Sequence, residues 1–189
     1  ELEKVARRVA NNEPKEYDLI FNVPPGTTKT ATVSIFFPIW CWVNWFWMRF
    51  ITSSHSSPLS LESAEYSRDV IRSEKFKQIF PEIAVKQNKD TKSNFRVVKN
   101  VGGVWISGGG RVSTSVTAKI MGFHSHIRIP DDLIDPEGAI SEAEIRKANS
   151  HLDVLSTRKV DKEVSVMIMI SQLRLSGFRL SGATIYIPE

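Results

Sequence analysis

The sequence predicts an α/β fold in which helices flank a mostly parallel β-sheet, and three observations carry this prediction. Short apolar runs typical of buried strands alternate with longer stretches of helical periodicity, a pattern that favours parallel sheets. Polar residues suited to a site follow three of the predicted strands, and the carboxyl ends of parallel strands share one edge. The chain has 189 residues, enough for one domain with a sizeable core. We therefore expect a single domain over residues 1–189, without internal repeats.

The individual elements follow from apolar periodicity and from the residues that interrupt it. Ser141 followed by Glu144 is a capping box, which predicts the start of a helix. Glycines at 102–103 and 108–110 predict turns on both sides of a short strand, and the polar stretch 86–94 predicts a hairpin. The predicted helices are residues 2–10, 30–39, 59–80 and 141–155, and the predicted strands are residues 17–23, 49–54, 83–85, 95–98, 104–107, 126–129 and 164–170.

Composition narrows the possible function classes. The hydrophobic fraction of 41% is that of a globular protein rather than a disordered one. A net charge of +4 and a pI of about 9.2 permit contact with nucleic acid without requiring it. The single cysteine, Cys41, excludes an intrachain disulfide and a cysteine-based metal cluster, and it fits a reducing compartment. His124 and His126 lie two positions apart with no cysteine to support them, so we expect no zinc site.

Residues 35–51 form the one stretch that could be mistaken for a membrane span. Pro38, Asn44 and Arg49 interrupt it, and it is shorter than the roughly 20 apolar residues that a span requires. We therefore expect the end of a helix, a tryptophan-rich connection and a strand, with no membrane contact. An exposed aromatic patch for a partner is the alternative. The chain begins at Glu1 without a signal-peptide pattern, which indicates an excised fragment.

Residues 22–30, with the sequence NVPPGTTKT, lie between a predicted strand and a predicted helix, which is the context of a phosphate-binding loop. The N–H groups of such a loop favour an anion, Lys29 can reach the β- and γ-phosphates, and Thr30 can ligate Mg²⁺. The glycines of the usual pattern are replaced by Val23 and Thr28, so a plain Pro-Gly turn is the alternative. The residues expected to bind ATP are Pro25, Gly26, Thr27, Thr28, Lys29 and Thr30.

An acidic pair, Asp131 and Asp132, follows a predicted strand about a hundred residues after this loop. At such a place one carboxylate holds Mg²⁺ and its neighbour polarises the attacking water. We assign Asp131 to the metal and Asp132 to the water, with a Pro-Asp-Asp turn as the alternative. Arg128 and Pro130 weaken the strand prediction, because proline cannot donate in a central ladder. Gln172, which ends the last apolar run, is a candidate sensor of the γ-phosphate.

Several further stretches belong to the same signal and occur in order along nearly the whole chain. They are residues 22–30, 37–40, 49–54, 59–69, 73–78, 89–96, 122–126, 131–136 and 155–162. Together they resemble the N-terminal ATPase domain of the large terminase subunit of tailed bacteriophages. The resemblance implies a P-loop NTPase of the ASCE type, with a Walker A loop that ends at Lys29 and Thr30. It likewise implies a Walker B strand that ends at Asp131 and the catalytic carboxylate Asp132, with Gln172 in the coupling motif.

The resemblance also implies a function. Large terminase subunits are motors that use ATP and Mg²⁺ to package viral double-stranded DNA into a procapsid. They form a ring on the portal protein and work with a small terminase subunit, which places the protein in the host cytoplasm and transiently on the procapsid. The family's C-terminal nuclease domain has no counterpart in these residues, so we expect the ATPase domain alone.

Three departures from the family pattern keep other functions open. Arg128 and Pro130 intrude on the aliphatic strand, the second acidic position is often Glu but is Asp132, and LRLSG at 173–177 stands where we expect Arg-Leu-His and an acidic pair. These departures favour a homologue of the same fold that binds a nucleotide or a partner without hydrolysis. A helicase-like translocase shares the same site, but stretches 59–69 and 155–162 favour the packaging family.

An arginine that neutralises the transferred phosphoryl group is expected from a neighbouring subunit, because the loop holds threonines where many relatives keep an arginine. The candidates, in order of preference, are Arg68, Arg72 and Arg111. The first two lie four positions apart on one predicted helix face. The alternative is that they pair with Glu65 and Asp69 on a solvated helix.

Overall fold

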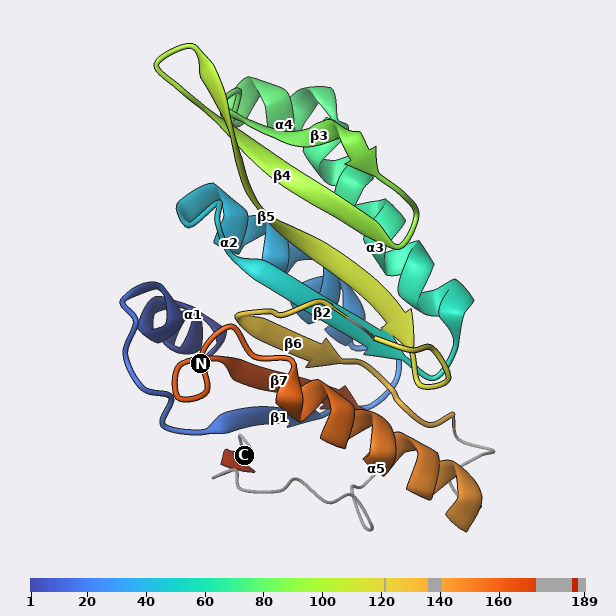
Figure 1. Ribbon diagram of the computed structural model, residues 1–189. Coiled ribbons are helices and arrows are strands. Elements are labelled where there is room, and N and C mark those ends of the chain that lie inside the picture. The colour runs from blue at the N-terminus through green and yellow to red at the C-terminus, as the bar shows by residue number, and fades with distance from the viewer. Residues whose placement is uncertain (121, 136–140, 173–184, 187–189) are drawn as a thin grey trace.

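The computed structural model describes residues 1–120, 122–135, 141–172 and 185–186. Its centre is an eight-stranded sheet of order β3-β4-β5-β2-β6-β7-β1-β8 (Figure 1). The strands are β1 (Asp18–Asn22), β2 (Arg49–Ser54), β3 (Ile83–Asp90), β4 (Asn94–Val101), β5 (Val104–Ser115), β6 (Ile127–Pro130), β7 (Val166–Ser171) and β8 (Ile185–Tyr186). The helices are α1 (Leu2–Ala10), the π-helix η1 (Thr30–Phe36), α2 (Phe37–Asn44), α3 (Ser57–Arg72), α4 (Glu74–Ile79) and α5 (Glu142–Thr157).

The predicted mostly parallel sheet is confirmed. Each neighbouring pair from β5 through β2, β6, β7 and β1 to β8 is parallel, whereas β4 is antiparallel to both of its neighbours, β3 and β5. Strand β7 lies between β1 and β6 and pairs with both. The carboxyl ends of these three strands therefore meet at one edge, which is where ligands bind in sheets of this kind.

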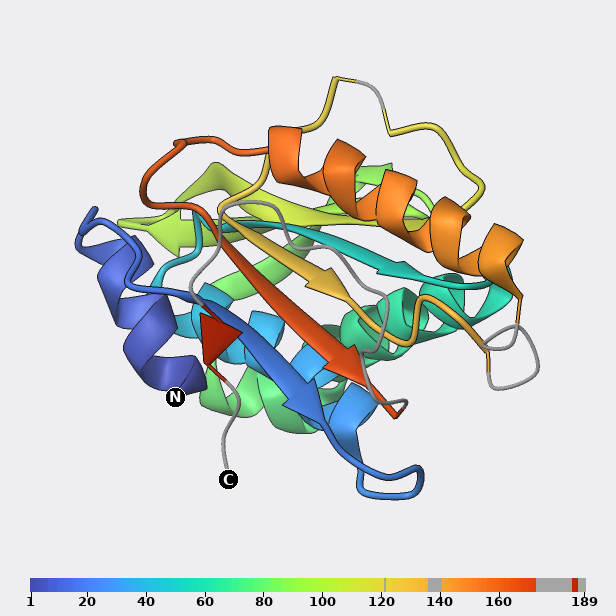
Figure 2. The same cartoon turned by 90° about the horizontal axis from the view of Figure 1, so that it is seen from below.

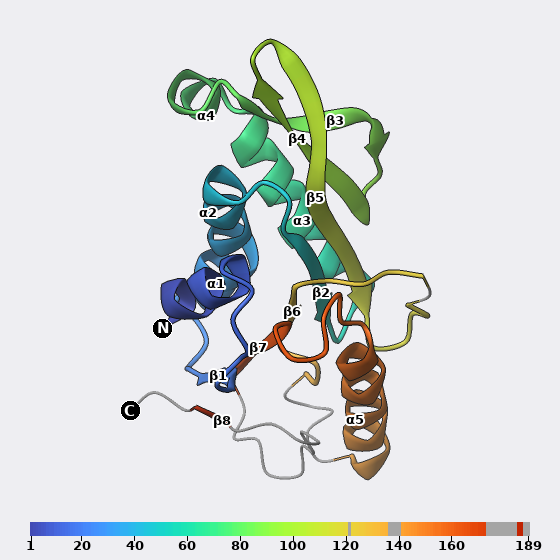
Figure 3. The same cartoon turned by 60° about the vertical axis from the view of Figure 1, so that its left-hand side comes forward.

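Helices cover both faces of the sheet. Helices α1, α2 and α3 lie on one face and α5 lies on the other (Figures 2 and 3). On the first face Trp42 packs edge-to-face on Phe50, with ring centroids 5.4 Å apart. On the second face α5 buries Ala148, Leu152 and Leu155 against the sheet. Within the described residues, no helix is long and apolar enough to cross a membrane.

The three consecutive glycines lie inside β5, so the prediction of a turn at 108–110 was wrong. A Cβ on Gly109 would lie 1.8 Å from the Met48 carbonyl oxygen, and a Cβ on Gly108 would lie 2.4 Å from the Phe46 carbonyl oxygen. The amide of Gly109 donates to the Phe46 carbonyl at 2.8 Å. Glycine is needed here because another backbone segment approaches closely, not because the chain reverses.

The helix predicted over residues 59–80 is two helices. Ser73 separates them, because its hydroxyl accepts a hydrogen bond from the Phe76 amide at 3.2 Å and so caps α4. The tryptophan-rich connection is also different from the prediction, since α2 continues through Asn44. Both changes leave the following strands, β2 and β3, at the predicted places.

Two further local predictions need correction. The hairpin strands continue through most of the polar stretch 86–94, and the turn is confined to the residues around Thr91, whose amide donates to the Asn94 carbonyl at 2.9 Å. Ser141 precedes α5 as expected, but its side chain forms no capping hydrogen bond. Glu144 pairs with Lys147 at 2.6 Å instead of closing a capping box.

Candidate functional site

The loop between β1 and η1 is exposed and offers free backbone donors. Gly26 and Thr28 have positive φ angles of 79° and 57°, so the loop turns tightly. The Thr27 hydroxyl donates to the Pro24 carbonyl at 2.8 Å and closes the turn. Among the described residues, no acceptor is found for the amides of residues 26–29. Free amides at the start of a helix favour an anion, so the loop is suited to a phosphate group.

Lys29 reaches from this loop to the acidic pair. Its Nζ lies 2.7 Å from Oδ2 of Asp132, and the two side chains are 9% and 20% exposed. Oδ1 of Asp132 accepts a hydrogen bond from the amide of Gln172 at 2.9 Å. The Asp132 carbonyl accepts one from the His55 amide at 3.1 Å. These contacts hold Asp132 at a φ of 43°, which is uncommon for a residue other than glycine.

Asp131 is buried beside this pair and is bonded on one side only. The Ser34 hydroxyl donates to Oδ2 at 2.7 Å, whereas Oδ1 is buried and has no hydrogen-bond partner among the described residues. Burial raises the pKa of the Asp131 carboxyl, and the nearby hydroxyls of Ser34 and Thr30 and the charge of Lys29 oppose that rise. A buried carboxylate oxygen without a partner lowers the stability of the fold unless a bound ligand interacts with it.

Arg111 supports Ser34 from inside the core. It is 1% exposed, and burial lowers its pKa to about 9, against the opposing charge of Asp131. Its Nη1 donates to the Ser34 carbonyl at 2.6 Å, so Ser34 links the arginine to the carboxylate. A side chain that donates a hydrogen bond to a helix carbonyl competes with the backbone bond of that helix and favours a π-turn, and η1 is a π-helix. The other acceptors of the guanidinium are Thr52, Ser63, Ser67 and Ser113.

A cleft of about 310 Å³ opens at this edge of the sheet. Its walls come from η1, the N-terminal half of α3, the end of β2 and the three predicted strand-end residues Asp131, Asp132 and Gln172. Lys29 and the exposed loop are adjacent to the cleft but do not line it, whereas Thr30 does. The structure therefore brings Thr30, Asp131, Asp132 and Gln172 together around one hollow, and Lys29 contacts Asp132 from the adjacent loop.

Thr30 and Asp131 are the described residues that fit a magnesium ion. The free oxygen of Asp131 and the hydroxyl of Thr30 are hard oxygen ligands, and Mg²⁺ in nucleotide sites takes few protein ligands plus substrate phosphates and water. Within the described residues, no group of three or more His, Cys, Asp or Glu could hold a metal ion by itself.

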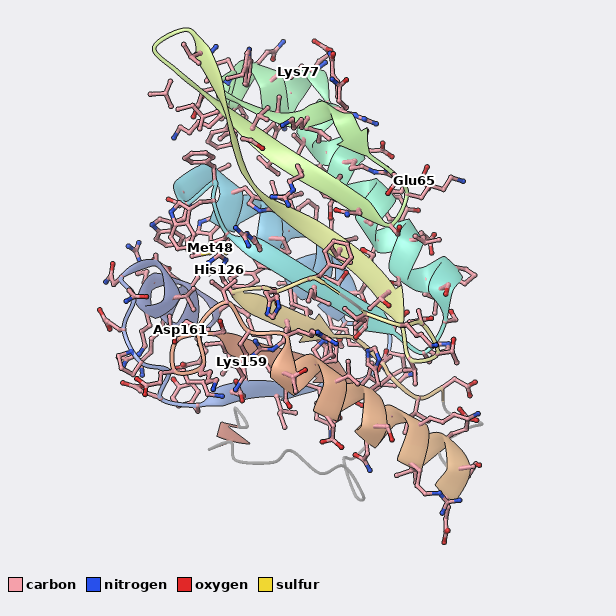
Figure 4. All side chains as sticks on the ribbon, viewed as in Figure 1. Met48, Glu65, Lys77, His126, Lys159 and Asp161 are labelled. Carbon is pink, nitrogen blue, oxygen red and sulfur yellow. The ribbon has the colours of Figure 1, made fainter. Side chains whose placement is uncertain are left out.

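The arginines proposed to act on a neighbouring subunit occupy other places. Arg68 is 7% exposed and donates to Asp90 at 3.0 Å, and Arg72 also bonds Asp90. The expected partner Glu65 is exposed at the outer side of α3 (Figure 4). Arg111 is enclosed, so its assignment as a donor to another subunit is wrong. Of the three, Arg72 has the accessible side chain, at 52%.

Arg128 and Pro130 do not prevent the central strand. Arg128 is fully buried in β6 and donates to the Ser165 carbonyl at 3.2 Å. The ladder between β6 and β7 stops after Arg128 and resumes at Asp131, which pairs with Ile170. Pro130 lacks the N–H that would continue it, so the interruption has a local cause. The Asp131 amide donates to the Ser53 carbonyl at 2.8 Å on the other side.

Two residues of the site, Ser34 and His55, were not predicted, and Arg111 was predicted only as a candidate for a different role. Ser34, His55 and Arg111 contact the acidic pair or its support through partners far away in the chain. A serine inside a helix and an arginine after three glycines carry no local signal of this kind. The signal for His55 was its position directly after a predicted strand, at the same sheet edge as the other site residues.

The strand order and the loop together define the class: this is the fold of P-loop NTPases of the ASCE type, in which β7 separates the loop-bearing β1 from the acidic strand β6. No protein-family model and no curated protein matches the chain. Among solved structures, the chain is similar to the large terminase ATPase domain of a Thermus phage, with a TM-score of 0.55, 13% identity, and 88% of this chain and 64% of that chain covered.

An arginine-to-alanine mutant of that terminase domain gives a TM-score of 0.53 at 12% identity, with the same coverage of 88% and 64%. A Saccharomyces cerevisiae Dbp5 complex that contains ADP gives 0.49 at 12% identity, with 99% of this chain and 51% of that chain covered. The chain spans 64% of the length of the terminase structures. At these identities the similarity shows a terminase-like ATPase fold.

Proposed function

We propose that this chain is the ATP-hydrolysing motor domain of a phage large terminase, which drives viral double-stranded DNA into a procapsid. The contact between Lys29 and Asp132 carries the proposal. In this contact the ammonium group of Lys29 meets the carboxylate of Asp132 at the edge of the sheet where β1, β6 and β7 end. Lys29 belongs to the loop whose backbone amides find no acceptor among the described residues. A lysine and a carboxylate in this arrangement are the parts that bind and hydrolyse a nucleoside triphosphate. The fold similarity to a terminase ATPase domain supports the choice of motor.

The residues of the Walker A loop bind the phosphates, and the residues at the strand ends act on the attacking water. The loop amides and Lys29 bind the β- and γ-phosphates. When Lys29 turns to the phosphates, Asp132 loses its counterion and can accept a hydrogen bond from the attacking water. The amide of Gln172 keeps hold of Asp132 Oδ1 during this exchange, so the carboxylate stays oriented. The Gln172 side chain lines the cleft and is the proposed sensor of the γ-phosphate.

Thr30 and the Walker B residue Asp131 are assigned to Mg²⁺. When bound, the ion would supply positive charge that offsets the charge of the transferred phosphoryl group. The chain's part is to fix the carboxylate: Ser34 bonds one oxygen of Asp131, and Arg111 bonds the carbonyl of Ser34. The second oxygen of Asp131 is left for the ion.

The partners follow from the motor assignment. We include double-stranded DNA, the portal protein, a small terminase subunit and further copies of this chain in a ring, in the host cytoplasm and transiently on the procapsid. In a ring, Arg72 is the candidate for the charge supplied to a neighbour, since its side chain is half-exposed. Arg72 would leave Asp90 and bind the phosphoryl group, which carries the larger negative charge.

Mg²⁺-dependent ATP hydrolysis by the purified protein, with and without duplex DNA and at increasing protein concentration, tests the proposal. We expect slow turnover in the dilute protein and faster turnover when subunits assemble, because an arginine finger can be worth about 10³–10⁵ in rate. Nucleotide binding without turnover in every condition would instead support the non-hydrolysing homologue.

A further inference from the structure

A second hollow lies on the other face of the sheet, away from the nucleotide cleft. It is a groove of about 730 Å³ between α5 and the segment 116–120 that follows β5. Figure 2 shows this segment in yellow beside the orange helix α5. The nucleotide cleft is lined instead by η1 and α3, which belong to the opposite face. None of the residues assigned to ATP lines the groove.

The groove carries one sign of charge. Among the described residues that line it, none is Asp or Glu, although acidic residues number 21 in the chain against 25 basic ones. Two of its cations pair along α5 with Glu142 and Glu144, in exposed contacts that are worth little and are easily exchanged. Among the described residues the other two cations have no ion pair. The lining cations are Lys119, Arg146, Lys147 and Arg158.

The spacing of these cations fits a repeating polyanion. Lys147 and Arg158 lie eleven positions apart on α5 and at its end, or about 16 Å along the helix axis. One strand of DNA places a phosphate roughly every 3.4 Å along its axis, so several phosphates lie within this span. Lys119 faces the helix from the other wall, and the exposed Thr117 hydroxyl beside it is a further type of phosphate donor.

We propose that this groove binds the phosphate backbone of DNA. The apolar part of the lining consists of small and aliphatic residues, which are Val116, Ala118, Ile120, Ala143 and Val154. The cations lie on both walls of the groove, and this placement complements a sugar-phosphate backbone.

The groove is joined to the nucleotide cleft by short contacts. The amide of Val116, in the groove wall, donates to the carbonyl of Ser54, in the cleft wall, at 3.1 Å. Ser115 next to it accepts from Ser57 of α3 at 2.9 Å and lies 3.3 Å from the hydroxyl of Thr117. These contacts form a continuous hydrogen-bonded path from segment 116–120 to the end of β2, next to His55, whose imidazole bonds the Asp132 carbonyl.

This inference rests on the proposed motor function for the identity of the polyanion, but its test requires no ATP turnover. The experiment measures binding of a short fluorescent DNA duplex by anisotropy over a series of salt concentrations. The groove variant combines Lys119→Ala with Arg158→Ala. Lys119→Ala alone is measured as well, so that the test can still be read if the double variant does not fold. The control combines Lys75→Ala with Arg7→Ala, which removes the same charges from exposed sites on α4 and α1.

We expect the groove double variant to bind at least about tenfold more weakly and to lower the slope of log K against log salt by about 2, since each phosphate contact contributes about 0.9. The control should keep the parental slope. Equal losses in both doubles, or no duplex binding by a protein that hydrolyses ATP, would overturn the groove assignment.

Two other results separate the alternatives. Binding of polyglutamate that depends on Lys119 and Arg158, without binding of duplex, would overturn the DNA assignment in favour of an acidic protein partner. Groove-dependent duplex binding by a protein that does not hydrolyse ATP would support the groove and contradict the ATPase proposal.

Discussion

Nζ of Lys29 and Oδ2 of Asp132 lie 2.7 Å apart, so the loop cation and the carboxylate at the strand end satisfy each other's charge within the chain. Under the proposed function, a triphosphate that attracts Lys29 would also release Asp132. Phosphate binding would then activate the carboxylate, and Asp132 would stay paired whenever the loop holds no phosphate. The predictions for the site follow from this coupling.

Lys29→Ala should lower ATP turnover by at least about 10²-fold, the loss typical for removal of one charge-stabilising donor in a site. The fold should persist, because Asp132 keeps its bond from the Gln172 amide. Steady-state phosphate release and a thermal melt measure the two effects. The matched control is Lys75→Ala, an exposed lysine on α4. Parental turnover in Lys29→Ala would show that the loop does not hold the phosphates.

Asp132→Asn and Asp131→Asn should differ. Asp132→Asn should stop hydrolysis and leave ATP binding intact, because an amide cannot polarise water as a carboxylate does. Asp131→Asn should also raise the Mg²⁺ concentration needed for binding, since its free oxygen is the proposed ligand. Binding of ATP titrated with Mg²⁺, beside a turnover assay, separates the two. Identical behaviour in both assays would contradict the division of roles.

Arg111→Met should destabilise the protein by about 3–5 kcal/mol, because it leaves several buried oxygens, including the Ser34 carbonyl, without their donor. Arg111→Lys should recover part of the loss but not all, since an ammonium cannot reproduce the fork of a guanidinium. Urea unfolding measures both. Arg7→Met, on the exposed face of α1, should change stability by less than about 1 kcal/mol. A similar small change in Arg111→Met would mean that the network is not structural.

Gly109→Ala should cost at least about 2 kcal/mol, because the added Cβ would lie 1.8 Å from the Met48 carbonyl oxygen and the segment before β2 would have to move away from β5. Ser107→Ala, two residues earlier on the same strand at an exposed position, should stay within about 0.5 kcal/mol. Thermal and denaturant melts of the two variants compare these sites. Equal stability would place the glycines in a mobile turn, as the sequence predicts.

Local signals predict the elements that position the site. The apolar run of β2 and the loop with Lys29 are specified by neighbouring residues, and the structure has β2 at residues 49–54 as predicted. The same reasoning fails for Gly108 and Gly109, because the demand for glycine comes from the backbone of residues 46–48, which lies about sixty positions away in the chain. Propensity alone cannot distinguish a turn glycine from one that admits a neighbouring strand.

The support of the acidic pair is hidden from the sequence for the same reason. Ser34 and Arg111 are 77 positions apart, and their contact exists only after η1, α3, β2 and β5 pack together. From the sequence alone, an arginine is expected at the surface, which is why Arg111 is the third of the three candidates for a donor to another subunit. Asp131 and Asp132 were found because two adjacent carboxylates after a strand are visible in the sequence itself.

Stability should fall as the pH drops from about 6.5 to about 4, and His151 should account for part of that loss. His151 is a buried residue of α5, and its burial lowers its pKa from 6.5 to about 4, so the native state resists the proton that the unfolded chain accepts. The unfolded state binds more protons throughout this window, and the stability due to neutral His151 is therefore present above pH 6.5 and lost as pH falls through 4. A shift of this size corresponds to about 3 kcal/mol.

Urea unfolding of the parent and of His151→Leu across this pH range measures the effect. The parent should lose up to about 3 kcal/mol more than the variant between the two ends, because leucine has no proton to bind. His126, whose pKa burial also lowers to about 4, stays in both proteins and contributes equally to both. His124→Leu, at an exposed site, should keep the parental pH dependence. Parallel stability curves for the parent and His151→Leu would show that His151 takes up its proton as readily in the folded protein as in the unfolded chain.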